Sequence, residues 1–260
     1  MLKFLNRWTG SIPAPEPIRA SVPDGVRVYA IGDIHGRLDL LEELFDQISE
    51  DSTARGPATT RLVFLGDLID RGPDSAKVVE RIRQLCLESG NVDVLTGNHE
   101  EVFLLALDGD IDAMRMFVRI GGRETILSYG ISEDDIARAD YAQLCALAQQ
   151  ATPDTHIQFL KLLPDVIEIG DYAFVHAGIR PGLALVDQAL SDLRWIRGGF
   201  LNHEGDFGKI IVHGHTVTRT VDERHNRIGI DTGAFRTGRL TALGLQGSKR
   251  WYLSTEPEGG

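Results

Sequence analysis

Five short polar clusters, each following an apolar run typical of a β-strand, constrain the fold of this chain most strongly. They are Gly32-Asp33-Ile34-His35-Gly36, Gly66-Asp67-Leu68-Ile69-Asp70-Arg71-Gly72, Gly97-Asn98-His99-Glu100, His176-Ala177-Gly178 and His213-Gly214-His215-Thr216. In open sheets, ligands bind in the crevice beyond the carboxyl ends of the strands. We therefore expect the five clusters to meet at one site at the ends of their strands.

The spacing of apolar residues predicts strands alternating with helices in the first half of the chain and mostly strands in the second. Strands are expected at 26–31, 61–65, 92–95, 166–169, 172–175, 210–212, 227–230, 240–245 and 250–253, with helices at 38–50 and 74–88. A helical tract at about 100–163 interrupts the strands, which indicates a cap or insertion. The order predicts an α/β (α+β) fold, in which a βαβα half and antiparallel strands form two packed sheets with helices outside.

The 260-residue length and 42% hydrophobic content suit one globular domain, which we place at 25–255 with its helical insertion at 100–163. Residues 1–24 contain Pro13, Pro15 and Pro17 and no apolar core of signal-peptide length, so we expect a loosely packed arm. Docking of 1–8 on the domain is favoured over a role at a lipid surface. No apolar run approaches the roughly 20 residues of a membrane span.

The net charge of −11 argues against stable, sequence-independent binding of nucleic acid, which needs Lys and Arg to neutralise phosphates. Cys86 and Cys145 lie in helical stretches without metal-type spacing. We interpret them as buried thiols of a protein in the reducing cytoplasm rather than as a disulfide.

The polar clusters supply the side chains of a metal site. Asp33 and His35 are two residues apart and can face one ion just beyond a strand, while Asp67 could bridge two ions. Asn98 and the later histidines complete a mixed oxygen and nitrogen ligand set, which suits Mn²⁺, Fe²⁺ or Zn²⁺ better than Ca²⁺. Any one cluster also matches a turn or a helix cap, but five in series favour the metal site.

With these clusters the chain resembles the calcineurin-like metallophosphoesterase superfamily, and within it the phosphoprotein phosphatases of small bacterial and phage type. The resemblance spans about residues 26–245. It is carried by the complete Gly66–Gly72 heptad, by Glu100, by Trp195-Ile196-Arg197 and by Ile230-Asp231-Thr232-Gly233-Ala234. It implies a β-sandwich of two mixed sheets flanked by helices, with a helical cap.

The resemblance also implies roles for individual residues. Asp33 and His35 would hold a first divalent ion, Asp67 would bridge, and Asn98, His176 and His215 would hold a second. The two ions would be Mn²⁺, with Fe or Zn as alternatives. His99 would be the general acid, oriented by Asp70, while Arg71 and Arg197 would grip the phosphate. A hydroxide bridging the ions would attack the phosphorus directly.

One position departs from the pattern: Thr96 stands where many protein phosphatases of this family have an Arg before Gly-Asn-His-Glu. Arg123 and Arg180 are candidates to supply the missing cation. Related bacterial diadenosine tetraphosphate hydrolases also lack that Arg, but they replace the residues corresponding to Asp70 and Glu100. Retention of both favours the phosphatase branch.

The sequence therefore predicts a phosphomonoesterase whose substrate is a phosphorylated Ser/Thr protein or a small phosphoester. A hydrolase of dinucleoside polyphosphates or nucleotide caps, with a base pocket in the helical tract, is the alternative. An inactive binding scaffold is disfavoured because every expected ligand is present. The sequence leaves the oligomeric state open.

Several further residues receive structural interpretations. His213 is expected beside the ligands as a hydrogen-bonding residue or a third imidazole, and Asp231 in a turn next to the metals. We expect a helix break at Gly121-Gly122-Arg123 and packing of Trp195 behind Arg197. His156, His203 and His225 are expected at the surface.

Overall fold

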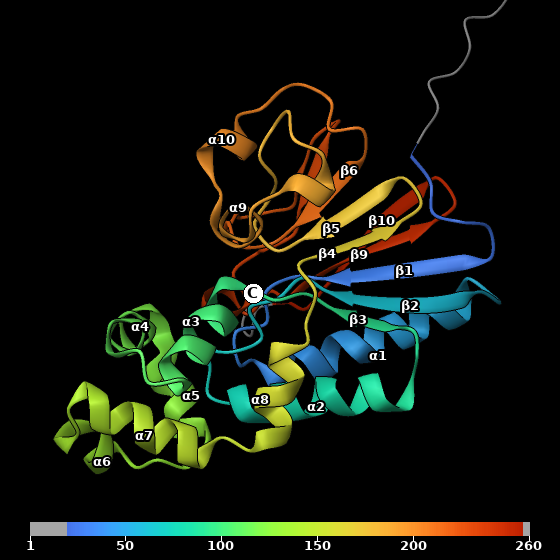
Figure 1. The fold of residues 1–260 in the computed structure, drawn as a ribbon. Helices are drawn as coiled ribbons and strands as arrows, with labels where there is room; N and C mark the ends of the chain where they lie inside the picture. The colour runs from blue at the N-terminus through green and yellow to red at the C-terminus, as the bar shows by residue number, and fades with distance from the viewer. Residues whose placement is uncertain (1–19, 257–260) are drawn as a thin grey trace, which may run out of the picture.

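The computed structural model describes residues 20–256, which form two five-stranded sheets packed face to face (Figure 1). The first sheet has the order β10-β9-β1-β2-β3, with bounds Lys249–Ser254, Thr241–Gln246, Val26–Ile31, Thr59–Phe64 and Val92–Val94. The second has the order β4-β5-β6-β8-β7, with bounds Val166–Ile169, Tyr172–Val175, Ile210–His213, Arg227–Gly229 and Asp222–Glu223. Both sheets are mixed, as expected.

Each sheet contains three neighbouring parallel strands. In the first, β1, β2 and β3 run parallel and β9 and β10 are antiparallel additions. In the second, β5, β6 and β8 are parallel, while β4 and β7 pair antiparallel at the edges. The expectation of antiparallel strands throughout the second half is therefore wrong. The connections from β5 to β6 and from β6 to β8 are long enough to return the chain to the same end of the sheet, which permits parallel pairing.

Helices flank both sheets. Beneath the first sheet lie α1 (Leu38–Ala54) and α2 (Ser75–Glu88), while α9 (Leu190–Trp195) and α10 (Gly198–Leu201) lie against the second (Figure 1). Between β3 and β4 come α3 (Asn98–Leu107), α4 (Ile111–Phe117), a π-turn η1 (Val118–Gly122), α5 (Arg123–Ser128), α6 (Glu133–Arg138), α7 (Tyr141–Ala151) and α8 (Asp154–Lys161). Most of this helical insertion gathers at one end of the sheets. A 3₁₀ turn η2 (Leu185–Asp187) and α11 (Ala234–Thr237) complete the described chain.

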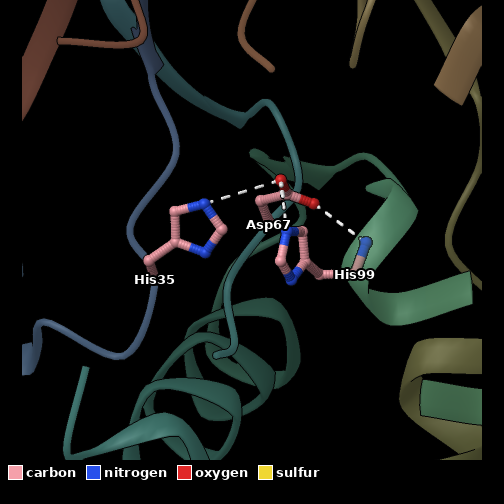
Figure 2. Close-up of side chains that lie close together, drawn as sticks. All are labelled: His35, Asp67 and His99. Carbon is pink, nitrogen blue, oxygen red and sulfur yellow. Dashed lines mark hydrogen bonds and ion pairs between the residues drawn. The ribbon is translucent and has the colours of Figure 1, made fainter. Parts of the chain in front are cut away.

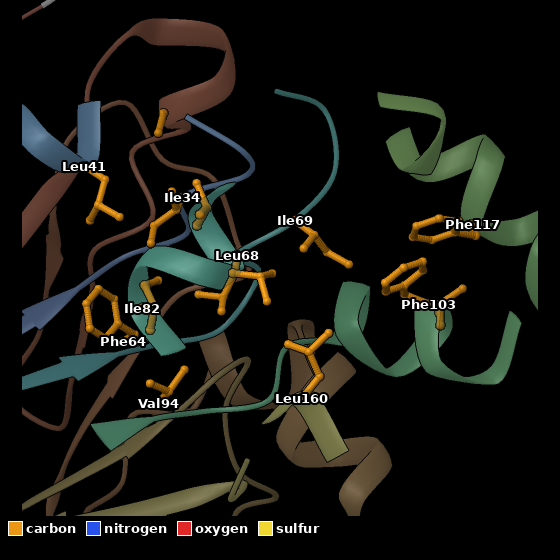
Figure 3. Packing of buried hydrophobic residues seen from close by; sticks show 14 of the residues in the cluster. Ile34, Leu41, Phe64, Leu68, Ile69, Ile82, Val94, Phe103, Phe117 and Leu160 are labelled. Atoms are coloured by element: carbon orange, nitrogen blue, oxygen red, sulfur yellow. The ribbon is translucent and has the colours of Figure 1, made fainter. Parts of the chain in front are cut away.

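Alternation along β1 explains why this strand lies between two hydrophobic cores. Val28 and Ala30 point into the core between the two sheets, where they meet residues such as Phe174 and Val212. Tyr29 and Ile31 point to the opposite face, where they pack with the helices. That second core continues from the α1 and α2 side into the insertion, where the ring centroids of Phe103 and Phe117 are 4.9 Å apart (Figure 3). The insertion is thus packed continuously with the sheet that carries the first three clusters.

The predicted elements match the structure apart from short pieces and a few burial assignments. Neither β7 nor the short α9, α10 and α11 was predicted. His156 is buried, not at the surface, because it lies four residues before Leu160 on the inward face of α8. Its imidazole contacts the Tyr129 hydroxyl and the Glu80 carboxylate at 3.0 and 2.9 Å. Both cysteines are free thiols, but only Cys145 is fully buried.

Most of the expected N-terminal arm, residues 1–19, lies outside the described residues, and the interpretations of 1–8 lie there with it. The part that is described, 20–24, is not loosely packed as expected. Val22 is buried in the core between the sheets, and its N–H donates to Gly247 O at 3.1 Å. Within residues 20–256 no helix is both long and apolar enough to cross a membrane.

Candidate metal centre and acid dyad

Asp67 lies at the centre of the site, at the carboxyl end of β2. Its carboxylate belongs to two groups of potential metal ligands, one with His35 and His99 and one with His176 and His215. Within each group the ligand atoms lie within 4.8 Å of one another, and all five residues are buried. Figure 2 shows His35 and His99 directed toward Asp67. One carboxylate shared between two ligand groups is the arrangement that a bridging residue requires.

The backbone around these side chains adopts conformations that are uncommon for residues other than glycine. His35, Asp67 and His215 have φ angles of 48°, 51° and 63°. Left-handed conformations of this kind cost about 1–3 kcal/mol each and persist where the surrounding structure enforces them. A Cβ on Gly97 would lie 2.2 Å from Asp67 Oδ1, so only glycine permits this approach.

Glu100 holds the strained loop after β2 in place. Its buried carboxylate accepts N–H groups from Gly97, Asp67 and Leu68 at 2.8, 2.9 and 2.8 Å, and from Ile69 at 3.4 Å. Burial and the nearby Asp67 raise the pKa of Glu100, whereas these N–H donors favour the ionised form. Glu100 thereby joins the third cluster to the second.

Two histidines have their tautomers set by backbone carbonyls. The Nδ1–H of His35 donates to Ile69 O and that of His176 to Leu65 O, each at 2.8 Å. Burial lowers the pKa of both imidazoles and keeps them neutral. Their Nε2 atoms therefore carry lone pairs that point into the site, with Asp67 oxygens at 3.6 Å from His35 and 3.4 Å from His176. A carbonyl at the opposite ring nitrogen is the usual partner of a metal-binding histidine.

The polar atoms of the second ligand group converge on Asn98 Oδ1. Asn98 Oδ1 lies 2.9 Å from His176 Nε2 and 2.8 Å from His215 Nδ1. Burial and then His176 lower the pKa of His215 to about 3, so this ring is also neutral. Burial would raise the pKa of Asp67, but the imidazoles around it, His176 first, lower it and keep the carboxylate ionised. Nitrogen and oxygen atoms that converge in this way can hold a divalent cation.

Asp33 lies beside Asp231 and the backbone of His215. It belongs to neither ligand group; its carboxylate accepts the backbone N–H of His215 at 3.0 Å and lies beside Asp231. Burial, then Asp231 and Asp67, raise its pKa. Asp231 accepts the Gly233 N–H at 2.9 Å through Oδ1, while its buried Oδ2 has no partner. Two buried carboxylates side by side favour a nearby cation, and the role of Asp33 as a ligand stays a prediction.

His99 and Asp70 form a buried dyad, with His99 Nδ1 at 2.5 Å from Asp70 Oδ2. Burial opposes a charge on His99, but the carboxylates of Asp67 and Asp70 outweigh it and raise the pKa of the imidazole. His99 can therefore carry a proton, whereas the pKa values of the other histidines that face Asp67 are lowered. Such a group suits a general acid.

Arg71 lies beside this dyad. Its guanidinium nitrogens lie 2.8 Å from His35 Nε2 and 3.0 Å from His99 Nε2, and its Cζ lies 4.6 Å from the ring centroid of Phe235. Arg197 is exposed, and its charge helps to lower the pKa of His215. The structure thus places one predicted arginine among the ligands and the other at the rim.

The candidates for a replacement cation are both engaged elsewhere. Arg123 pairs with Glu133, and Arg180 pairs with Asp192 at 2.8 Å. Thr96 is buried, and its hydroxyl donates to Leu163 O at 2.9 Å. No sequence pattern indicated Arg194, which pairs with Glu101 and Asp165 and whose charge contributes to the lowered pKa of His176.

The other residues discussed in the sequence analysis lie next to the site or support its surroundings. His213 lies outside both ligand groups, with Nδ1 at 3.1 Å from Gly214 O and its ring 5.0 Å from that of Phe200. Trp195 donates to Glu101 at 2.6 Å, and its ring centroid lies 6.3 Å from that of His215. Gly121 has φ 116°, which confirms the expected helix break.

Comparison with known proteins gives consistent matches. Residues 26–237 match the family model described as calcineurin-like phosphoesterase. The asymmetrical bis(5'-nucleosyl)-tetraphosphatase PrpE of Anoxybacillus flavithermus is 27% identical over 237 residues, covering 82% of this chain and 88% of that protein. Serine/threonine-protein phosphatase 2 of Escherichia coli is 29% identical over 230 residues, covering 82% and 90%.

The fold is also similar to solved structures. A protein serine/threonine phosphatase from Saccharomyces cerevisiae superposes with a TM-score of 0.57 at 17% identity, covering 91% of this chain and 81% of that one. At this identity the likeness concerns the fold alone.

Proposed function

Because the chain belongs to the calcineurin-like phosphoesterase family, we propose that it is a two-metal phosphatase that hydrolyses phosphate monoesters of serine and threonine in proteins. The observation that carries this proposal is the placement of the His99–Asp70 dyad beside a carboxylate, Asp67, that two ligand groups share. A dyad of this kind can protonate a poor leaving group such as a seryl oxygen.

The proposed cofactors are two divalent ions, with Mn²⁺ as the metal suited to mixed oxygen and nitrogen ligands. His35, Asp33 and Asp67 would hold one, and Asp67, Asn98, His176 and His215 the other. Together they would supply an activated water as nucleophile and neutralise phosphate charge. The close approach of His176 Nε2 and His215 Nδ1 to Asn98 Oδ1 supports this assignment.

Protein side chains would protonate the leaving group and bind the phosphate. His99 gives its proton to the departing oxygen, and Asp70 holds the imidazole by its Nδ1. The guanidinium of Arg71 donates to His35 Nε2 and His99 Nε2 in this structure. With a phosphate bound it would turn to the phosphate oxygens, for which its planar fork is well matched, and leave His99 Nε2 free to carry the acid's proton. Arg197 at the rim adds a second positive charge for the incoming dianion.

A dinucleoside tetraphosphatase is the second candidate. Similarity to the tetraphosphatase of Anoxybacillus flavithermus favours it, as does Thr96 in the place of an Arg. Phe235 adds a structural reason, because its partly exposed ring lies next to Arg71 and 5.4 Å from the His35 ring, where a nucleobase could stack.

A rate comparison separates the two candidates. With Mn²⁺ supplied, kcat/KM is measured on a phosphoserine peptide and on diadenosine tetraphosphate. The proposal predicts the higher value on the peptide. A higher kcat/KM on the dinucleotide would favour the second candidate. In that case Phe235→Leu should lower kcat/KM on the dinucleotide and leave kcat/KM on a small phosphoester such as p-nitrophenyl phosphate largely unchanged. No turnover of either substrate would contradict both.

A further inference from the structure

The helical insertion reaches into the site through the turn between α4 and α5. Gly121 O accepts the backbone N–H of Arg71 at 2.9 Å, and Ile120 O accepts the Arg71 Nε–H at 3.3 Å. A Cβ on Gly121 would lie 2.6 Å from Arg71 Cγ, so the two segments are in close contact. The insertion therefore abuts the Asp70-Arg71 dipeptide directly.

One turn further on, Thr125 of α5 contacts the carboxylate of the acid dyad. Its hydroxyl donates to Asp70 Oδ1 at 2.6 Å and accepts the Asp70 backbone N–H at 2.9 Å. Ser75 Oγ lies 3.0 Å from both the Thr125 hydroxyl and the Asp70 nitrogen. Thr125, Asp70 and Ser75 are all fully buried.

The two oxygens of Asp70 thus have different partners: Oδ2 faces His99 and Oδ1 faces Thr125. Rotation about the last torsion of an aspartate side chain is broad, so a hydrogen bond at one oxygen leaves the plane of the carboxylate poorly defined. A charge-assisted hydrogen bond at the second oxygen fixes that plane. The Thr125 hydroxyl also shares with Ser75 Oγ the N–H of the left-handed Asp70 backbone, whose φ is 74°.

We propose that Thr125 of the helical insertion is a positioning residue for the general acid: it orients Asp70 and, through Asp70, the imidazole of His99. This inference rests on the proposed role of His99. The helical insertion would then support the chemistry in addition to packing at the end of the sheets.

The test compares esters that differ in their need for an acid. An alkyl phosphate requires protonation of its leaving oxygen, whereas p-nitrophenolate leaves with little assistance. Thr125→Val keeps the shape of the side chain and removes the hydroxyl. We expect its kcat to fall about 10- to 100-fold on the alkyl ester, part of the 10²- to 10⁴-fold that a general acid contributes, and less than about threefold on the aryl ester. Thr125→Ser, which keeps the hydroxyl, should restore most of the alkyl rate, whereas Thr125→Ala should not.

Two controls make the result specific. Thr152→Val removes another buried threonine hydroxyl of the insertion, one that donates to Ala148 O at 2.8 Å, and should leave both rates unchanged. In the His99→Asn background, Thr125→Val should change the alkyl rate by less than about twofold, because residues that act through one another are not additive. If the valine variant does not fold, the Ser and Ala pair supplies the same comparison.

Three results would overturn the inference: an equal fall on both esters, no rescue by serine, or a full effect of Thr125→Val without His99. The single variant His99→Asn, measured in parallel, tests the acid itself: its kcat should fall much more on the alkyl ester than on the aryl ester. If His99→Asn slows both esters equally, the proposed acid fails and the role of Thr125 fails with it. If His99→Asn slows mainly the alkyl ester as expected but the Thr125 variants do not behave as expected, the acid assignment stands and the positioning role of Thr125 is refuted.

Discussion

Glu100→Gln tests how the loop that carries Asp67 is held. In the wild type, Oε2 accepts the N–H groups of Gly97 and Asp67, and Oε1 accepts that of Leu68 with a weaker contact to Ile69. A glutamine has one acceptor oxygen. Whichever way its amide is turned, the NH₂ group faces at least one buried N–H that loses its partner.

The size of the effect follows from that count. In the better orientation the amide oxygen keeps Gly97 and Asp67, and the Leu68 N–H is left unpaired. A buried donor without a partner costs about 1–3 kcal/mol, and the other orientation leaves two such donors. We therefore expect Glu100→Gln to lower the free energy of unfolding by about 1–3 kcal/mol. Displacement of Asp67 should weaken metal binding about 10- to 100-fold, as loss of other groups that support metal ligands does.

The assays are urea denaturation of the metal-free protein and calorimetric titration with Mn²⁺. Glu88→Gln is the matched control, since Glu88 is exposed at the end of α2 and should change stability by less than about 0.5 kcal/mol. If Glu100→Gln left both stability and Mn²⁺ affinity within the range of that control, the loop would not depend on these hydrogen bonds and the reasoning would be refuted.

Three further predictions concern other residues. His99→Asn should reduce kcat by about 10²-fold or more on alkyl phosphates and much less on p-nitrophenyl phosphate, because the acid assists only a poor leaving group; equal losses on the two esters would remove the acid assignment. Arg71→Lys should lower kcat/KM about 10- to 100-fold, since an ammonium cannot reproduce the planar fork; a change below about threefold would show that Arg71 does not bind the phosphate. His156 is neutral because burial lowers its pKa, so the unfolded chain takes up a proton near pH 6.5 before the folded one does. Its contribution to stability is therefore present above that pH and is lost as the pH falls, and the stability of His156→Gln, measured by urea denaturation at pH 7.5 and 5.5, should fall less over this interval than that of the wild type. An equal fall in the free energy of unfolding of both proteins would show that His156 is not the source of this pH dependence.

The site was more predictable from the sequence than its supporting contacts were. The clusters around Asp67 and His99 follow parallel strands, whose carboxyl ends share one edge of a sheet, so position in the chain alone indicates that they meet. The contact between Thr125 and Asp70 joins residues 55 positions apart. No local pattern in α5 predicts it, because a threonine in a helix is ordinary.

Other differences also have physical causes. The two-residue strand β7 (Asp222–Glu223) has no apolar run, and it forms because β8 offers a free edge. The burial of His156 could have been predicted, since it shares a helix face with Leu160. The proximity of Asp33 to Asp231 is consistent with the expectation that both lie at one site, although two buried like charges are costly together unless something neutralises them.

The central claim, a two-metal centre bridged by Asp67, is tested most directly by anomalous diffraction from crystals of the protein grown with Mn²⁺. The account predicts two manganese peaks, one on each side of the Asp67 carboxylate, the first coordinated by His35 Nε2 and the second by Asn98, His176 and His215. A single peak, or manganese bound away from Asp67, would contradict it.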